Sequence, residues 1–379
     1  MLYLDHAATS PVRPEVLEAM RPYLTGVFGN PSSHHTVGEA AASALDDARR
    51  RVARILGMRT GDVVFTAGGT EANNLAVKGI VLAALAAERR HLVVSPIEHE
   101  SILESADFLR RFHGVDVSAV PVDARGRISV AALQEAIRSD TALVAIGHAN
   151  NEIGTIQDVA SLAAVARNAG APLHVDAVQS AGWLPLADLG ADAIAIAGHK
   201  IGAPKGIGAL AVRGRIPLEP ILHGGGQERG RRSGTENVAG AVALATALEL
   251  AEAERDEVST RVGAMTRAFI HELLRLVPQA TLTGDASMRL PGTASFTFSG
   301  VSGEAVLLEL ERRGIVSSSG SACAAGSDEP SHVLLACGID PAVAQTSVRF
   351  TFGRAPVSED LPERLALLVF ESVAAVAGG

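Results

Sequence analysis

Short apolar segments alternate with segments of helical periodicity along most of this chain. The apolar segments, such as residues 63–66, 142–147 and 193–197, have the length and composition of strands that are buried on both faces. Between such segments, residues 71–87 and 100–113 repeat their apolar side chains with the period of a helix. Because parallel strands need a crossover to join them, the alternation predicts an α/β protein with a mainly parallel sheet.

A long helical region from residue 238 to about residue 277 follows the alternating part, and no linker rich in proline or glycine interrupts it. Beyond it the pattern predicts strands at residues 294–299 and 347–352 and a helix at residues 304–313. We therefore expect the helical region to lead into a second domain. The predicted division is a large domain with a seven-stranded sheet at residues 13–255, and a smaller α+β domain made of residues 1–12 and 256–379.

The composition of the chain argues against several functional classes. With 379 residues, 47% of them hydrophobic, the chain is long enough for two domains with cores of their own. The net charge is −9 and no basic block is present, so we expect no nucleic-acid partner. We find no signal peptide and no apolar run that would span a membrane. Two cysteines make no disulfide framework, and the cytoplasm is the expected compartment.

Two polar side chains end neighbouring predicted strands. Lys200 closes the run that follows the apolar residues 193–196, and Asp176 ends the strand before it. A lysine and an aspartate so placed suit pyridoxal phosphate (PLP), because the amine forms a Schiff base and the carboxylate holds the ring nitrogen protonated. For Asp176 alone, a helix N-cap is an equally good interpretation. Gln179, close behind Asp176, belongs to the same polar segment.

Gly69 and Thr70 lie between a predicted strand and a predicted helix. Glycine lets a phosphate approach the backbone, and the first N–H groups of a helix attract an anion. A simple capping turn is the alternative, and the segment is not a P-loop because no Gly-Lys-Ser/Thr follows.

Three further residues are candidates for the same site. An imidazole at His99 could stack on a planar ring and carry protons, although an isolated histidine is more often a surface or core residue. Asn151 follows the strand that ends near residue 147 and could bond a phenolate or a carboxylate, with a plain turn as the alternative. Arg349, on a predicted strand, suits a substrate carboxylate if it points into a site rather than to solvent.

The two cysteines have different surroundings. Cys323 stands among Ser, Gly and Ala residues, which predicts an exposed loop and a reactive thiol. Cys337, next to two leucines, is interpreted as an ordinary buried cysteine, and the spacing of the two excludes a zinc site built from cysteines. A glycine-rich polar loop at residues 223–235 is either flexible or reaches the site of a neighbouring subunit.

Taken together, these segments resemble a known family over essentially the whole chain. The chain resembles the cysteine desulfurases of the NifS/IscS type, within the fold-type I, class V aminotransferase-like PLP enzymes. Several ordered motifs at consistent spacing are far more specific than any one of them. They are YLDHAAT at residues 3–9, GTEANN at 69–74, NNEIG at 150–154, HVDA at 174–177, GHK at 198–200, RSGT at 232–235, SGSAC at 319–323 and VRF at 348–350.

The resemblance implies a role for each candidate. Lys200 would form the aldimine with PLP, Asp176 would pair with the pyridine nitrogen, and His99 would stack on the ring. Gln179 and Asn151 would lie near the phenolate oxygen, Arg349 would bind the substrate carboxylate, and Cys323 would accept the sulfur. The phosphate would be held by Gly69, Thr70, His199 and, from the other subunit of a homodimer, Thr235. The chain departs from many relatives at Ala197, where they carry serine, which removes one hydroxyl from the phosphate site.

The implied activity is conversion of L-cysteine to L-alanine through an aldimine and a ketimine, after which the Cys323 thiolate attacks the substrate sulfur and becomes a persulfide. A sulfur-acceptor protein, either an iron–sulfur scaffold or a thiolation protein, is the expected partner. Two alternatives stay open at this point. A selenocysteine lyase uses the same scaffold, and a catalytically idle PLP-fold protein would bind partners only. The intact set of Lys200, Asp176, His99 and Cys323 argues against the second.

Overall fold

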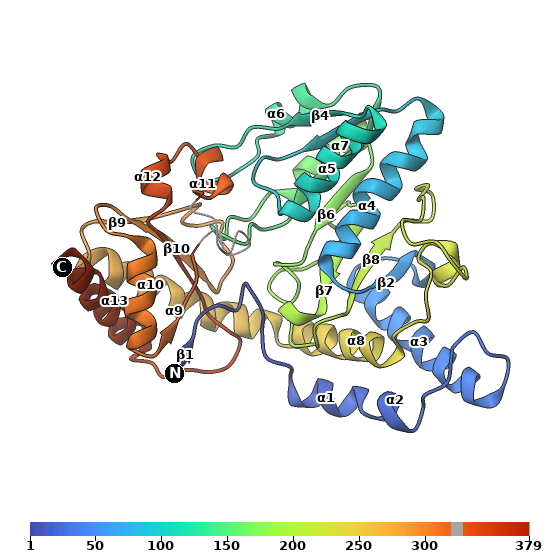
Figure 1. The fold of residues 1–379 in the computed structure, drawn as a ribbon, viewed down its shortest axis with the longest axis horizontal. Coiled ribbons are helices and arrows are strands. Elements are labelled where there is room, and N and C mark those ends of the chain that lie inside the picture. The colour runs from blue at the N-terminus through green and yellow to red at the C-terminus, as the bar shows by residue number, and fades with distance from the viewer. Residues whose placement is uncertain (320–328, 379) are drawn as a thin grey trace.

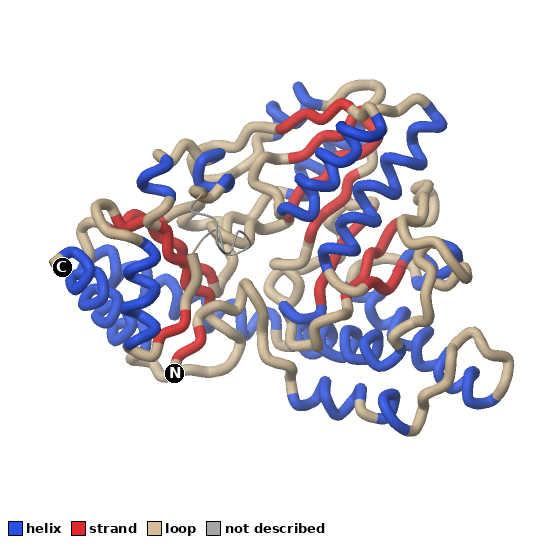
Figure 2. Tube along the Cα trace, in the orientation of Figure 1, coloured by secondary structure: helices blue, strands red, loops and turns tan. Residues whose placement is uncertain are grey.

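Residues 1–319 and 329–378 are described by a computed structural model. They form two regions, each with its own sheet and its own apolar core (Figures 1 and 2). Cys323 lies outside the described residues.

Seven strands form the larger sheet, in the order β2-β8-β7-β6-β5-β3-β4. The neighbours from β4 to β7 are parallel, whereas β8 runs antiparallel to both β7 and β2. The bounds are Val63–Thr66 (β2), His91–Val94 (β3), Asp116–Ala119 (β4), Thr141–Gly147 (β5), Leu173–Asp176 (β6), Ala193–Ala197 (β7) and Gly208–Val212 (β8). The prediction of a mainly parallel seven-stranded sheet is therefore confirmed.

Helices cover both faces of this sheet, which explains why its strands are apolar at successive positions. Alternate side chains of one strand enter different cores: Val64 packs with α4 and α5, and Phe65 packs with α3 and α8. The helices are Pro14–Met20 (α1), Pro22–Thr25 (α2), Thr36–Ile55 (α3), Gly69–Ala84 (α4), Glu100–His113 (α5), Val130–Ala136 (α6), Val159–Asn168 (α7) and Val238–Ala253 (α8). Short 3-10 turns are Thr60–Asp62 (η1), Leu85–Ala87 (η2), Gly198–Lys200 (η3) and Glu228–Gly230 (η4).

The second region is built around an antiparallel sheet in the order β12-β10-β9. Phe269, Phe296 and Phe350 contact one another edge to face in its core, and each is 0% exposed. The strands are Leu2–Tyr3 (β1), Ala280–Leu282 (β9), Thr293–Phe298 (β10), Ile315–Val316 (β11) and Ser347–Thr351 (β12). The helices are Arg255–Leu276 (α9), Gly303–Arg312 (α10), His332–Ala336 (α11), Pro341–Ala344 (α12) and Leu361–Ala377 (α13). The expected smaller α+β region is present.

The first residues of the chain belong to this second region. β1 pairs in parallel with β11, and Leu4 packs into the same core as the phenylalanines, so both chain ends lie at this end of the molecule (Figure 1). The helical region that links the two regions breaks at Glu254, which caps α8 and begins α9. The Glu254 carboxylate forms an ion pair with Arg13, with 2.5 Å between Oε1 and Nη1. In the described part of the chain, no helix is long and apolar enough to cross a membrane.

Candidate active site

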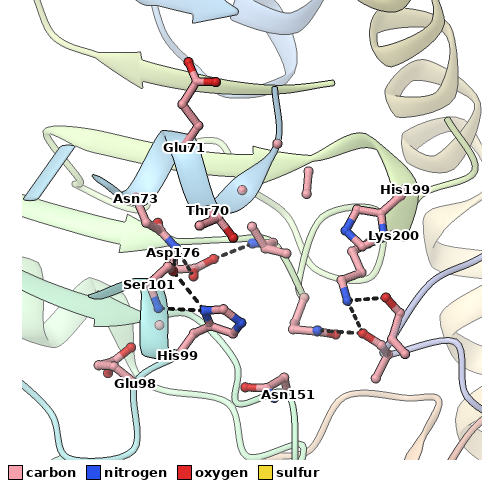
Figure 3. A pocket seen from close by; sticks show the side chains of 18 of the residues that line it. Thr70, Glu71, Asn73, Glu98, His99, Ser101, Asn151, Asp176, His199 and Lys200 are labelled. Atoms are coloured by element: carbon pink, nitrogen blue, oxygen red, sulfur yellow. Dashed lines mark hydrogen bonds between the residues drawn. The ribbon is translucent and has the colours of Figure 1, made fainter. Parts of the chain in front are cut away.

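A cavity of about 990 Å³ opens where the carboxyl ends of β5, β6 and β7 meet the amino end of α4 (Figure 3). This is the edge of a parallel sheet at which ligands bind. The cavity brings together most of the candidates that the sequence singles out. They are Gly69, Thr70, His99, Asn151, Asp176, Gln179, His199, Lys200 and Arg349.

The amino end of α4 meets the requirements of a phosphate site. Gly69 and Thr70 are the first two residues of the helix, so their N–H groups have no carbonyl partner one turn earlier. Gly69 is sterically required, since a Cβ atom there would come within 2.7 Å of Val178 Cγ2 and 3.3 Å of Ala197 Cβ. The Ala197 side chain therefore faces the beginning of α4.

Lys200 and His199 follow β7 in the turn η3 and contact the N-terminal segment of the chain. Lys200 Nζ donates to the backbone carbonyls of Ala7 and Ala8, the latter at 2.7 Å. His199 Nδ1 lies 3.2 Å from the Thr9 hydroxyl. Burial, reinforced by the positive charge of Lys200, lowers the pKa of His199 to about 4. His199 is therefore neutral at pH 7.

Gln179 lies near the same carbonyl that Lys200 contacts. Its side-chain amide donates to the Ala7 carbonyl at 3.1 Å. The N-terminal segment, far from Lys200 in the sequence, thus forms one wall of the cavity.

Asp176 ends β6, the sheet neighbour of β7, and is 9% exposed. Its Oδ1 accepts the N–H of Val178 at 2.9 Å and its Oδ2 accepts the amide of Asn73 at 2.6 Å. No ion pair to a Lys, Arg or His is formed by Asp176 among the described residues. Burying a carboxylate without a cation is costly, so the cavity that Asp176 lines suits a cationic ring nitrogen.

His99 is the N-cap of α5, and its ring orientation is fixed by two contacts. Nδ1 accepts the backbone N–H of Ser101 at 3.0 Å and lies 2.9 Å from the Ser101 hydroxyl. Because an N–H can be accepted only by an unprotonated nitrogen, the ring proton of neutral His99 is on Nε2. The ring lies near Asp176 and across the cavity from Lys200 (Figure 3).

The carboxyl group of Glu98 is a site feature for which the sequence analysis had no prediction. Glu98 lines the cavity at 4% exposure. Burial, and next the nearby Asp176 carboxylate, raise the pKa of Glu98 well above its usual range. A glutamate directly before His99 carried no signal of its own, because only the fold places it beside Asp176.

Arg349 lies on β12 of the second region, and it is buried rather than on an exposed strand face, at 2% exposure. Nη2 forms an ion pair with Asp5 Oδ1 at 2.8 Å, and Nη1 donates to the backbone carbonyl of Asn151 at 2.8 Å. The Nε donor is buried without a hydrogen-bond partner. A guanidinium with a donor still unused at the cavity suits a carboxylate ligand.

The candidates Cys323 and Thr235 differ from the others in what the structure says of them. Cys323 lies outside the described residues. Ser318 forms an isolated bridge with Arg349 through two backbone hydrogen bonds. Thr235 is exposed and does not line the cavity. Cys337 is buried as expected, and burial raises the pKa of its thiol to about 11.

The donor set fits PLP at each end of the cavity. Gly69 and the unpaired N–H groups of α4 lie where a phosphate would bind. Asp176, a buried carboxylate without a cation, lies where the ring nitrogen would be. The Lys200 amine lies on the wall formed with the N-terminal segment. Within the described residues, no group of three or more His, Cys, Asp or Glu side chains is arranged to hold a metal ion.

Comparison with known proteins gives matches over nearly the whole chain. The class-V aminotransferase family matches residues 2–363. A Mycobacterium tuberculosis protein named IscS-like cysteine desulfurase is 45% identical over 97% of this chain and 95% of its own length. The cysteine desulfurase IscS of Dictyoglomus turgidum is 42% identical over 97% of this chain and 93% of its own.

Solved structures agree with the sequence matches. A protein described as NifS-like has a TM-score of 0.91 and 33% identity, and the match covers 99% of both chains. A structure of SspA in complex with cysteine has a TM-score of 0.81 and 36% identity, covering 94% of this chain and all of that one.

Proposed function

Because the chain belongs to the class-V aminotransferase family and, within it, to the cysteine desulfurases, which depend on PLP, we propose that it converts L-cysteine to L-alanine and keeps the sulfur as a persulfide on Cys323. The observation that carries the proposal is Asp176, a buried carboxylate with two neutral donors and no cationic partner among the described residues. It lines the same cavity as Lys200, the amine that such a cofactor needs.

The roles of the cofactor-binding residues are part of this proposal. Lys200 binds the cofactor covalently, Asp176 pairs with the ring nitrogen, and His99 lies on the ring face. The beginning of α4, with Gly69 and Thr70, binds the phosphate together with His199, while Gln179 and Asn151 lie near the phenolate oxygen. When bound, PLP supplies an electron sink for the charge left on the substrate Cα once its proton is removed.

The remaining chemistry belongs to side chains of this protein. Arg349 binds the substrate carboxylate through the donors that Asp5 and Asn151 leave unused. Lys200 takes the Cα proton and returns a proton to Cα when alanine forms. The Cys323 thiolate attacks the substrate sulfur, the bond between Cβ and sulfur breaks, and its electron pair stays on carbon, which is protonated to give the methyl group of alanine.

We also propose a homodimer in the cytoplasm that passes its sulfur to an acceptor protein, either an iron–sulfur scaffold or a thiolation protein. Support for the dimer comes from Thr235, which is exposed at the end of a loop fixed by an ion pair between Arg232 and Glu71 at 2.8 Å. A residue so held does not bend back into its own cavity, and it is available to a neighbouring subunit. A cysteine that must cycle through a persulfide suits a reducing compartment.

The decisive experiment compares the two cysteines by measuring alanine formation from L-cysteine. Cys323→Ala should bind PLP normally and lose alanine formation by at least about 100-fold, because no other nucleophile takes the sulfur. Cys337→Ala is the matched control and should keep its activity, since a buried thiol with a pKa of about 11 stays protonated. Near-normal activity in Cys323→Ala would refute the persulfide route.

A further inference from the structure

Asn73, in the first turns of α4, is the centre of a buried hydrogen-bond chain that the assigned roles do not use. It is 1% exposed. Its amide nitrogen donates to Asp176 Oδ2 at 2.6 Å and to the Ser101 hydroxyl at 2.9 Å, and Figure 3 shows the three side chains together. One amide thus contacts the partner of the ring nitrogen and the residue that holds His99.

The orientation of the Asn73 amide follows from its neighbours. An ionised carboxylate only accepts hydrogen bonds, so the amide nitrogen must face Asp176. The amide oxygen then faces His174 Nε2, 2.9 Å away. His174 is fully buried, and burial lowers its pKa to about 4, so it is neutral and donates from Nε2. Asp176 and His174, both on β6, therefore agree on one orientation of the Asn73 amide on α4.

This arrangement fixes the orientation of the Asp176 carboxylate. The backbone N–H of Val178 occupies Oδ1 and Asn73 occupies Oδ2, so the plane of the group is fixed. Hydrogen bonds to a carboxylate are among the strong ones, so these two donors hold that plane firmly.

The hydrogen-bond chain also extends from Asn73 through Ser101 to His99. The Ser101 hydroxyl accepts from Asn73, which leaves its proton to share the lone pair of His99 Nδ1, 2.9 Å away, with the Ser101 backbone N–H. The amide of Asn73 thereby selects the direction of the Ser101 hydroxyl and, through it, supports the His99 tautomer with its proton on Nε2.

We propose that Asn73 is a positioning residue that holds the Asp176 carboxylate aimed at the ring nitrogen of PLP, and that its link through Ser101 couples this carboxylate to His99. The inference rests on the proposed PLP site. Asn73 acts through Asp176 and Ser101, and it is not itself expected to touch the reacting atoms.

The test compares two ligands by equilibrium dialysis: PLP, and an analogue whose ring nitrogen is replaced by carbon. The analogue has no ring proton for Asp176 to pair with. Asn73→Ala should weaken PLP binding by about 10- to 100-fold, as for a lost hydrogen bond to a charged group. It should change analogue binding by less than about threefold, so the preference for PLP over the analogue falls. Asn73→Ser, which is too short to span Asp176 and His174, should lower that preference as well and serves if the alanine variant does not fold.

Two controls separate this inference from general damage. Asn74→Ala changes the neighbouring residue, which bonds the Thr70 carbonyl and Lys78 instead, and should leave the preference unchanged. In an Asp176→Ala background, Asn73→Ala should have no further effect on the preference. Equal losses for the two ligands, or additive effects of the two changes, would overturn the role of Asn73. If the unmodified protein binds neither ligand, the proposed function itself fails.

Discussion

At the residue scale, the site depends on side chains whose burial sets their charge. His148, just after β5, is 6% exposed, and its Nδ1 is buried without a hydrogen-bond partner. Burial lowers its pKa to about 4. Its backbone N–H donates to the Asp176 carbonyl at 2.9 Å, so it belongs to the strand ends that carry the site. The folded protein is therefore more stable when the His148 imidazole is neutral.

His148 should make the protein less stable in mild acid. As the pH falls below about 6.5, the His148 imidazole binds a proton in the unfolded chain but stays neutral in the folded protein. The free energy of unfolding therefore decreases until the pH reaches the folded pKa of about 4. The expected loss from this one residue is about 2 kcal/mol at pH 5. Urea unfolding at pH 7.5 and pH 5 should show a smaller difference for His148→Gln than for the unmodified protein.

The matched control is His271→Gln, because the His271 side chain is 76% exposed. It should leave the difference between the two pH values as it is. An unchanged difference in His148→Gln would contradict the assignment of this pH dependence to burial.

At the element scale, the phosphate end of the cavity depends on how closely β7 approaches the beginning of α4. A Cβ atom on Gly69 would lie 3.3 Å from that of Ala197, so the two backbones are nearly in contact. Ala197 is 1% exposed and supplies no hydroxyl. At the proposed phosphate site, the helix N-terminus and its N–H groups would therefore carry more of the contact than they would with a serine at position 197.

Ala197→Ser should strengthen PLP binding. A serine hydroxyl at the beginning of α4 adds a hydrogen bond to a charged phosphate, worth about 10-fold in affinity or somewhat more. Ala195→Ser is the control, because Ala195 lies on the same face of β7 but deeper in the core and cannot reach the phosphate. Equilibrium dialysis of PLP would measure both, and a weaker or unchanged affinity in Ala197→Ser would count against this phosphate position.

At the scale of the whole molecule, each cavity is expected to be completed by a second copy of the chain. Thr235 is exposed, and its loop is held in place by a bond from the Gly234 N–H to Gln227 Oε1 at 2.8 Å. This hydrogen bond fixes the conformation of the loop, which leaves Thr235 on the surface. The division at residue 255 also belongs to this scale and stays a prediction.

Mixed dimers would reveal whether the sites are shared. In a dimer of one Thr235→Ala chain with one Lys200→Ala chain, a shared arrangement leaves one complete site, with Lys200 from one chain and Thr235 from the other. We expect one molecule of PLP to bind with the affinity of the unmodified protein, and about half of its alanine formation. If Thr235 served its own chain, no site would be complete and neither signal would appear.

The sequence alone determined the α/β class and most of the large sheet, because buried strands and amphipathic helices are local patterns that one chain segment carries by itself. It also indicated the candidates that end strands or begin helices, such as Asp176, Lys200 and Gly69, since strand ends gather at one edge of a parallel sheet. None of the patterns described above predicts α13, α1 or α2.

Only the tertiary structure decided which distant residues meet in the site. Asp5 pairs with Arg349 across 344 positions, and Asn73 joins Asp176 across 103. The carbonyls of Ala7 and Ala8 receive Lys200 because β1 pairs with β11, which draws the chain's first residues across the cavity. A buried polar side chain must find its partner wherever packing brings one, and no local pattern encodes that partner's position.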